Sequence, residues 1–236
     1  MRKNLDHHPA IRIAKVGEFD IAYREKTSDV AVLRHSFESD IYLTGVPEYS
    51  PLPHHVILDV GAHIGTFSLL ASSVAGRVYA IEPCFESFNL CQMNVRLNRL
   101  SNRITVSHLA LSDQQGECTL HYSEGNWGHT IMRRLSGGGE QVQALTLSEF
   151  LRVNGVTHCD FMKMNCEGAE FPIILKSSCE TLRQIRMLVV LYHCDLCSMA
   201  NEHDLLAHLR TCGFEAAIRN RIDQRGWIVA RQRRAR

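Results

Sequence analysis

The sequence predicts a doubly wound α/β fold, and two observations carry the prediction. Continuous apolar stretches alternate along the chain with stretches of helical spacing, which is typical of a parallel sheet covered by helices. The apolar stretches, such as "HVILDV", lack the alternation of a half-exposed strand, so we expect strands buried on both faces. With 236 residues, the chain is long enough to bury such a core.

The expected elements follow in a regular order from residue 55. Pro83 ends the second strand, Thr146 or Ser148 caps the third helix, and Gly213 closes the last helix. A glycine-rich loop is expected at 125–141. Strands are expected at 55–60, 77–83, 104–112, 116–123, 159–164, 185–193, 215–220 and 227–232, and helices at 66–75, 85–100, 145–155, 171–184 and 201–214.

The first 50 residues are expected to form a small appendage. Residues 11–24 alternate around Gly17 and predict a hairpin, and the apolar residues of 27–43 recur at helical spacing. The proline-rich stretch 47–55 is typical of a linker. We therefore predict an appendage over 1–50 and the main domain over 51–236.

The composition limits the classes of binding partner that the protein is expected to have. The net charge is +1 and the only basic cluster is the terminal "RQRRAR", so we expect a solvated tail and no nucleic-acid partner. No stretch approaches ~18 apolar residues, so no membrane partner is expected. The nine cysteines show no framework spacing, and the Cys194–Cys197 motif has no second pair. We expect reduced thiols and a cytoplasmic protein, and we leave a homodimer open.

The predicted strand ends carry the candidate ligand site, because ligands of open α/β sheets bind there. Asp59, Gly61 and Gly65 follow the first strand, without the G-x-G-x-x-G spacing that seats a pyrophosphate. Glu82 ends the next strand, where a carboxylate can accept both ribose hydroxyls. An adenosine without phosphates indicates S-adenosylmethionine. The alternatives are that Asp59 only caps its turn and Gly61 is an ordinary left-handed position.

Residues 56–176 resemble the FkbM-type S-adenosylmethionine-dependent methyltransferases. The matching stretches are "ILDVGAHIGTFSL", "RVYAIEP", "NVRLNRL", "ITVSHLALSD", "GECTLHY", "TLSEFL" and "FMKMNCEGAE". The resemblance implies a Rossmann-like class I methyltransferase sheet and methyl transfer, usually O-methylation of a hydroxyl on a sugar or small natural product. The implied partner is therefore a small-molecule acceptor.

The resemblance also implies roles for single residues. Glu82 would hold the ribose, and His63 would bond the carboxylate of the cofactor or a neighbouring residue. Asn165 and Glu167 would form the floor of the site. The methionine moiety would lie near Asp59, Gly61 and Gly65, and the adenine near Ala110, Leu111 and Ser112.

Three positions depart from the family pattern. His63 stands where the family usually has Asn, Asn165 where it usually has Asp, and Leu191 where a Glu is common. Two carboxylates are thereby lost, so we expect no carboxylate-bound metal.

Methyl transfer to an alcohol also needs a proton acceptor, and histidine suits that task near pH ~7. His193, after a buried strand, is the leading candidate, and His129 in the glycine-rich loop is the second. The remaining candidates are His63, His35, Glu167 and Glu170.

Two further side chains have open roles. Lys163 either orients Asn165 or touches substrate, or it points outward as a strand lysine. Trp127 either stacks on a substrate ring or only anchors its loop.

Two other functions stay open from the sequence. A nicotinamide-dependent oxidoreductase would share the sheet, although the missing G-x-G-x-x-G argues against it. A cofactor-binding protein without catalysis would explain Asn165 and Leu191.

Overall fold

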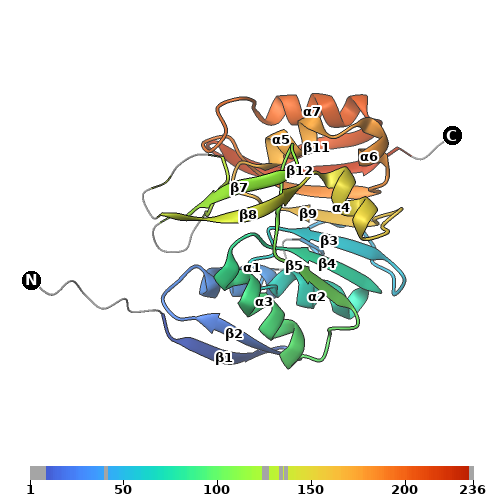
Figure 1. Ribbon diagram of the computed structural model, residues 1–236. Coiled ribbons are helices and arrows are strands. Elements are labelled where there is room, and N and C mark those ends of the chain that lie inside the picture. Colours follow the sequence, from blue (N-terminus) through green and yellow to red (C-terminus); the bar gives the residue numbers. More distant parts are fainter. Residues whose placement is uncertain (1–8, 40–41, 124–127, 133–134, 136–137, 234–236) are drawn as a thin grey trace, which may run out of the picture.

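A seven-stranded sheet forms the middle layer of the protein (Figure 1). The structure is a computed structural model that describes residues 9–39, 42–123, 128–132, 135 and 138–233. The strand order is β11 (Phe214–Ile222), β12 (Arg225–Gln232), β10 (Met187–His193), β9 (Phe161–Met164), β3 (Val56–Val60), β4 (Arg77–Ile81) and β5 (Ile104–Ser107).

The strands from β10 to β5 run parallel, as the doubly wound fold requires. β12 is antiparallel to β10, and β11 is antiparallel to β12, because these last two strands form a hairpin. The predicted fold class is therefore confirmed.

Helices cover both faces of the sheet. One face carries α1 (Asp29–Phe37), α2 (Thr66–Val74) and α3 (Phe85–Leu97); the other carries α4 (Leu147–Val153), α5 (Glu170–Lys176), α6 (Cys179–Arg183) and α7 (Glu202–Thr211). None of these described helices is long and apolar enough to cross a membrane.

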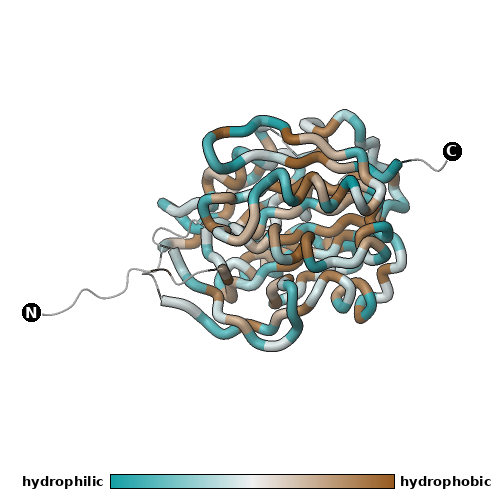
Figure 2. The backbone as a smooth tube through the Cα atoms, turned by 90° about the horizontal axis from the view of Figure 1, so that it is seen from above, coloured by the Kyte–Doolittle hydropathy of each residue, from teal (hydrophilic) through white to brown (hydrophobic). Residues whose placement is uncertain are grey.

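Each central strand feeds two cores, because neighbouring residues point to opposite faces. Ile57 and Val189 pack beneath α1–α3, whereas Leu58 and Val190 pack beneath α4–α7. Seen from above, hydrophobic residues gather in the middle of the molecule and hydrophilic ones lie towards its rim (Figure 2). The continuous apolar stretches of the sequence are thus strands with two buried faces.

Several predicted boundaries shift for local reasons. The expected helix 171–184 is interrupted at Ser178, whose side chain accepts a hydrogen bond from the Thr181 amide and starts α6. Thr146, one of the two proposed caps, accepts from the Glu149 amide at 3.2 Å and starts α4. The first helix ends at Phe37.

A second sheet was only partly foreseen. It has three strands in the order β6 (Ala110–Leu111), β8 (Gly139–Leu145) and β7 (Gly116–His121). The expected strand 104–112 splits between this sheet and β5, and the last residues of the expected glycine-rich loop, 139–141, begin strand β8. The glycines before and at the start of β8 have low strand propensity, so the sequence did not predict this strand. It forms because it pairs with a strand on each side, and such pairing can outweigh poor intrinsic propensity.

The N-terminal hairpin of β1 (Ile11–Val16) and β2 (Phe19–Arg24) docks on α3 through two asparagines. Asn94 exchanges hydrogen bonds with the backbone of Ala22 at 2.7 and 3.0 Å, and Asn98 does the same with Asp20 at 2.9 and 2.8 Å. These side chains satisfy backbone groups of the hairpin that face the helix. The domain boundary at residue 50 stays a prediction.

Cys179, the first residue of α6, forms a disulfide with Cys212, directly after α7, with Cα atoms 4.7 Å apart. The expectation that all cysteines are reduced thiols is therefore wrong for this pair. The two residues lie 33 positions apart with no motif around them, and only the packing of the two helices brings them together. The other seven cysteines are free thiols.

We expect the double variant Cys179→Ser/Cys212→Ser to lose about 3–4 kcal/mol of unfolding free energy, because the cross-link lowers the conformational entropy of the unfolded chain. Urea unfolding without reductant measures this loss. Cys118→Ser, at a free thiol on β7, is the control and should change little. Nine titratable thiols in the denatured, unreduced wild type would contradict the disulfide.

Candidate active site

The carboxyl ends of four neighbouring parallel strands bring the predicted site residues together. The glycine turn 61–65 follows β3, and Glu82 follows β4. Asn165 and Glu167 follow β9, and His193 ends β10. Since parallel strands end at one edge of the sheet, these segments form one polar cluster.

A buried ion pair lies beneath this cluster. Lys163 Nζ donates to Asp59 Oδ1 at 2.8 Å and to the Gly61 carbonyl at 2.6 Å, and Ser68 Oγ donates to Asp59 Oδ2 at 2.7 Å. Burial alone would lower the pKa of Lys163, but the Asp59 carboxylate raises it, so the amine stays charged. Lys163 is 4% exposed, so the alternative that it points outward is wrong.

The glycines of the turn are required by contacts within the protein. A Cβ atom on Gly61 would lie 1.9 Å from the Asn165 carbonyl oxygen, and one on Gly65 would lie 2.6 Å from Cys91 Sγ. Both glycines also have positive φ angles, of 75° and 83°. The turn therefore packs tightly on the turn after β9 and on α3, and these contacts, besides the close ligand expected from the sequence, require glycine.

Glu82 is held rigidly at the end of β4. Its Oε2 accepts from the His63 amide at 2.7 Å and its Oε1 accepts from the Cys84 amide at 2.9 Å. Burial raises the pKa of Glu82 to about 7, although the two amide donors favour the charged form. Each oxygen keeps one lone pair for a further donor.

The ring of His63 faces the start of α1. Its Nε2 lies 3.3 Å from Asp29 Oδ1 and 3.5 Å from Ser28 Oγ, both at the start of α1. Its Nδ1 is buried and has no hydrogen-bond partner in the part of the chain that the structure describes. Burial lowers the pKa of His63 to about 4.

His193 lies between two carboxylates. Its Nδ1 is 3.2 Å from Glu170 Oε1, and its Nε2 is 3.5 Å from Glu167 Oε2. Burial would lower the pKa of His193, but Glu170 and Glu167 raise it above its ordinary value. The ring is 1% exposed, so solvent does not replace either partner.

Glu170 and Glu167 differ although they share one turn. The Glu170 carboxylate is fully buried and accepts from the amides of Cys166 at 2.6 Å and Gly168 at 2.8 Å. Glu167 Oε2 is buried without a hydrogen-bond partner among the described residues, and so is Asn165 Oδ1. Burial raises the pKa of Glu167, and the His193 ring partly opposes that rise.

Residues 128–132 lie against this turn. Thr130 Oγ1 donates to the Glu167 carbonyl at 2.6 Å, and a Cβ atom on Gly128 would lie 3.0 Å from Glu167 Oε2. His129 Nδ1 accepts from the Ser123 amide at 3.1 Å, and burial lowers the pKa of His129. The other loop residue of interest, Trp127, lies outside the described residues.

The remaining predicted residues lie in or near the second sheet. Ala110 and Leu111 are buried in β6, and Ala110 packs with Cys84, next to the end of β4. The Ser112 amide donates to the Leu145 carbonyl at 2.9 Å. His35 is exposed on α1. Direct contact of any predicted residue with a cofactor stays a prediction.

Sequence reasoning missed Asp29 and Arg24. Arg24 binds Asp29 through Nε at 3.0 Å and Nη2 at 2.9 Å, and both side chains are buried. Neither residue stands in a motif; Arg24 ends β2, Asp29 begins α1, and Arg24 also donates to Ser87 of α3 at 2.9 Å. No signal in the sequence identified them.

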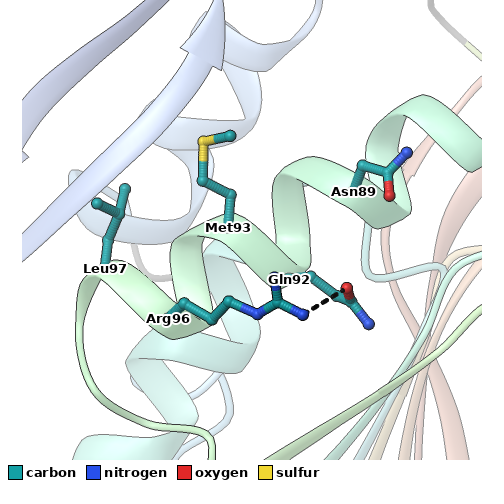
Figure 3. A pocket seen from close by; sticks show the side chains of 5 residues that line it. All are labelled: Asn89, Gln92, Met93, Arg96 and Leu97. Atoms are coloured by element: carbon teal, nitrogen blue, oxygen red, sulfur yellow. Dashed lines mark hydrogen bonds between the residues drawn. The ribbon is translucent and has the colours of Figure 1, made fainter.

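A surface hollow on α3 shares no residue with this cluster (Figure 3). The side chains that line it follow one exposed side of the helix, and Arg96 donates to Gln92 at 3.3 Å. They are Asn89, Gln92, Met93, Arg96 and Leu97. The hollow holds no group suited to acid–base chemistry, so the candidate site is the cluster at the strand ends.

We expect Lys163→Met to cost about 3–5 kcal/mol of unfolding free energy, because it leaves the Asp59 charge buried without a partner. The double variant Lys163→Met/Asp59→Leu should recover most of this loss. Urea unfolding measures both, with Lys15→Met, in an exposed pair with Asp20, as the control. Equal losses in the single and double variants would contradict the pairing.

Comparison with known proteins identifies the family. The sequence model of the family described as Methyltransferase FkbM domain matches residues 59–216. A curated relative, the AMB antimetabolite synthetase AmbE of Pseudomonas aeruginosa, is 28% identical over 209 residues. That match covers 71% of this chain but only 10% of the relative, so the chain spans about a tenth of its length.

Two solved structures share the fold. The methyltransferase FkbM from Methylobacillus flagellatus KT has a TM-score of 0.52 at 16% identity, over 78% of this chain and 44% of that one. The magnesium protoporphyrin IX methyltransferase ChlM from Synechocystis PCC 6803, with bound SAM, has a TM-score of 0.50 at 12% identity. That match covers 87% of this chain and 83% of ChlM. With a family match over more than half of its length, the chain belongs to the FkbM methyltransferase family.

Proposed function

We propose that the protein methylates a hydroxyl group of a sugar or small natural product, and that Glu167, backed by His193, takes the hydroxyl proton. The observation that carries this proposal is the Glu167 carboxylate, whose Oε2 is buried, unpartnered among the described residues and 3.5 Å from His193 Nε2. Buried polar atoms without partners are rare in folded proteins, and they point to a missing ligand.

The residues around the glycine turn suit an S-adenosyl cofactor. Three buried atoms there have no partner within the described chain, namely His63 Nδ1, Asn165 Oδ1 and Glu167 Oε2. Glu82 adds a carboxylate at the strand end where a ribose would bind. When bound, S-adenosylmethionine supplies a methyl group on a positively charged sulfur, which is an excellent leaving group.

The protein's own task is to orient the acceptor hydroxyl and to remove its proton as the new O–CH₃ bond forms. Glu167 suits the second task, because burial raises its pKa and its free oxygen can receive a proton. The O–H bond breaks and the proton moves to Glu167 Oε2. Glu167 also has a left-handed backbone, with φ of 50°, which fits a residue held for function.

His193, the leading candidate from the sequence, takes a supporting role in this proposal. Two flanking carboxylates raise its pKa and so favour the imidazolium form, which cannot accept a proton. Its positive charge instead stabilises Glu167 in the charged form that acts as a base. Glu170 fixes the ring through Nδ1, as the buried carboxylate of a catalytic triad does.

His129 suits a donor role better than that of a base. Its Nδ1 already accepts a hydrogen bond from the Ser123 amide. Burial lowers its pKa, so the neutral ring carries its proton on Nε2 and has no free lone pair. His129 can therefore donate to a ligand oxygen.

Two observations bear on the chemical class of the acceptor. The curated relative is named an antimetabolite synthetase, which favours a small natural product over a macromolecule. The net charge of +1 does not favour a polyanionic substrate. A cytoplasmic location and a homodimer stay predictions.

We expect the affinity for S-adenosylhomocysteine to rise by up to about tenfold from about pH 6 to pH 8. Glu82 has a pKa of about 7, and its ionised form is the stronger acceptor for ribose hydroxyls. Calorimetry measures the profile. Glu82→Gln should bind more weakly by about 1–3 kcal/mol and lose this pH dependence. If the affinity of wild type and variant changed equally with pH, Glu82 would not be the ribose-binding residue.

We expect Glu167→Gln to slow methyl transfer by about 10²–10⁴-fold, because the base is lost while the shape is kept. S-adenosylhomocysteine affinity should change by less than about twofold. A panel of sugars, phenols and peptides with labelled S-adenosylmethionine first identifies an acceptor and then gives the rates. Glu149→Gln, on the exposed side of α4, is the control. An unchanged rate in Glu167→Gln would rule out this base.

A further inference from the structure

The ring of His63 connects the glycine turn with the N-terminal appendage. Its amide donates to Glu82 Oε2 at 2.7 Å, while its Nε2 faces Asp29 Oδ1 at 3.3 Å. His63 adopts a left-handed backbone, with φ of 54°, which a non-glycine residue rarely does. His63 thus contacts both Glu82, which is proposed to bind ribose, and Asp29 of α1.

Asp29 cannot turn away from this ring. It is 0% exposed, and Arg24 holds it through the backbone amide at 2.7 Å, Nε at 3.0 Å and Nη2 at 2.9 Å. Burial would raise the pKa of Asp29, but the Arg24 guanidinium keeps it below its usual value. Asp29 is therefore a fixed anion that only accepts hydrogen bonds.

A fixed anion beside Nε2 determines which nitrogen of His63 carries the proton. The proton is stabilised on Nε2, so Nδ1 keeps its lone pair. Since burial lowers the pKa of His63 to about 4, the ring is neutral near pH ~7. Nδ1 is then a buried acceptor with no partner in the described chain, which is costly unless a ligand supplies a donor.

We propose that Asp29 positions His63 so that Nδ1 accepts a hydrogen bond from a hydroxyl or ammonium group of the bound S-adenosyl cofactor. Asp29 is a positioning residue, and His63 is the residue that contacts the ligand. The proposal rests on the proposed cofactor site, and it makes the appendage, which lies outside the family match at 59–216, part of that site.

Nitrogen-15 NMR of histidine-labelled protein tests the tautomer without any ligand, with His63 assigned by its absence in His63→Asn. We expect an unprotonated Nδ1 and a protonated Nε2 in the wild type. Asp29→Asn should mix the two tautomers. Glu86→Gln, which also removes a carboxylate that Arg24 contacts, should keep the wild-type tautomer. A proton on Nδ1 in the wild type would overturn the proposal.

Ligand titrations test the contact. S-adenosylhomocysteine should shift the Nδ1 resonance of His63, and 5′-methylthioadenosine should do so only if the donor is a ribose hydroxyl, because it lacks the ammonium group. Asp29→Asn should bind S-adenosylhomocysteine roughly tenfold more weakly, and Glu86→Gln should bind it as the wild type does.

Two outcomes separate this proposal from the proposed function. If S-adenosylhomocysteine binds the wild type tightly without moving the Nδ1 resonance, the His63 contact is wrong and the methyltransferase site stands. If it does not bind the wild type at all, the proposed cofactor site itself fails. If Asp29→Asn does not fold, His63→Asn provides the affinity comparison, and wild-type affinity in that variant would also overturn the proposal.

Discussion

The ion pair between Lys163 and Asp59 is the constraint on which the site depends. The two residues are register partners on β9 and β3, so the pair links the two central strands where they end. Lys163 also holds the Gly61 carbonyl, which fixes the first residue of the glycine turn. A buried charge without its partner is strongly destabilising, so the pair forces strand register and turn geometry to form together.

The glycine turn then organises its surroundings from both sides. Asn94 of α3 donates to the Ile64 carbonyl at 2.8 Å and also bonds the β2 backbone, so one amide connects the turn to the hairpin. His63 reaches the start of α1, and Thr66 bonds Ser36 on the same helix at 2.8 Å. The appendage is therefore packed into the wall of the site.

The two glutamates of the β9 turn show how environment assigns roles to equal side chains. Glu170 receives two backbone amides and the His193 ring, so its charge is satisfied and it serves as a rigid support. Among the described residues, Glu167 Oε2 has the His193 Nε2 atom at 3.5 Å and no hydrogen-bond partner, so this oxygen stays available. Their separation by three positions in the sequence would not reveal this difference.

The sequence by itself determined the fold class, the glycine turn, the position of Glu82 at a strand end and the family. These depend on local patterns, namely apolar strands, turn glycines and motif spacing. The sequence missed β8, which begins at Gly139 directly after a run of glycines and is a strand because it pairs with β6 and β7. Only the tertiary structure decided that Cys179 meets Cys212, that Lys163 is buried on Asp59 and that Asp29 faces His63. Such contacts join residues far apart in the chain, and packing, which no local pattern encodes, brings them together.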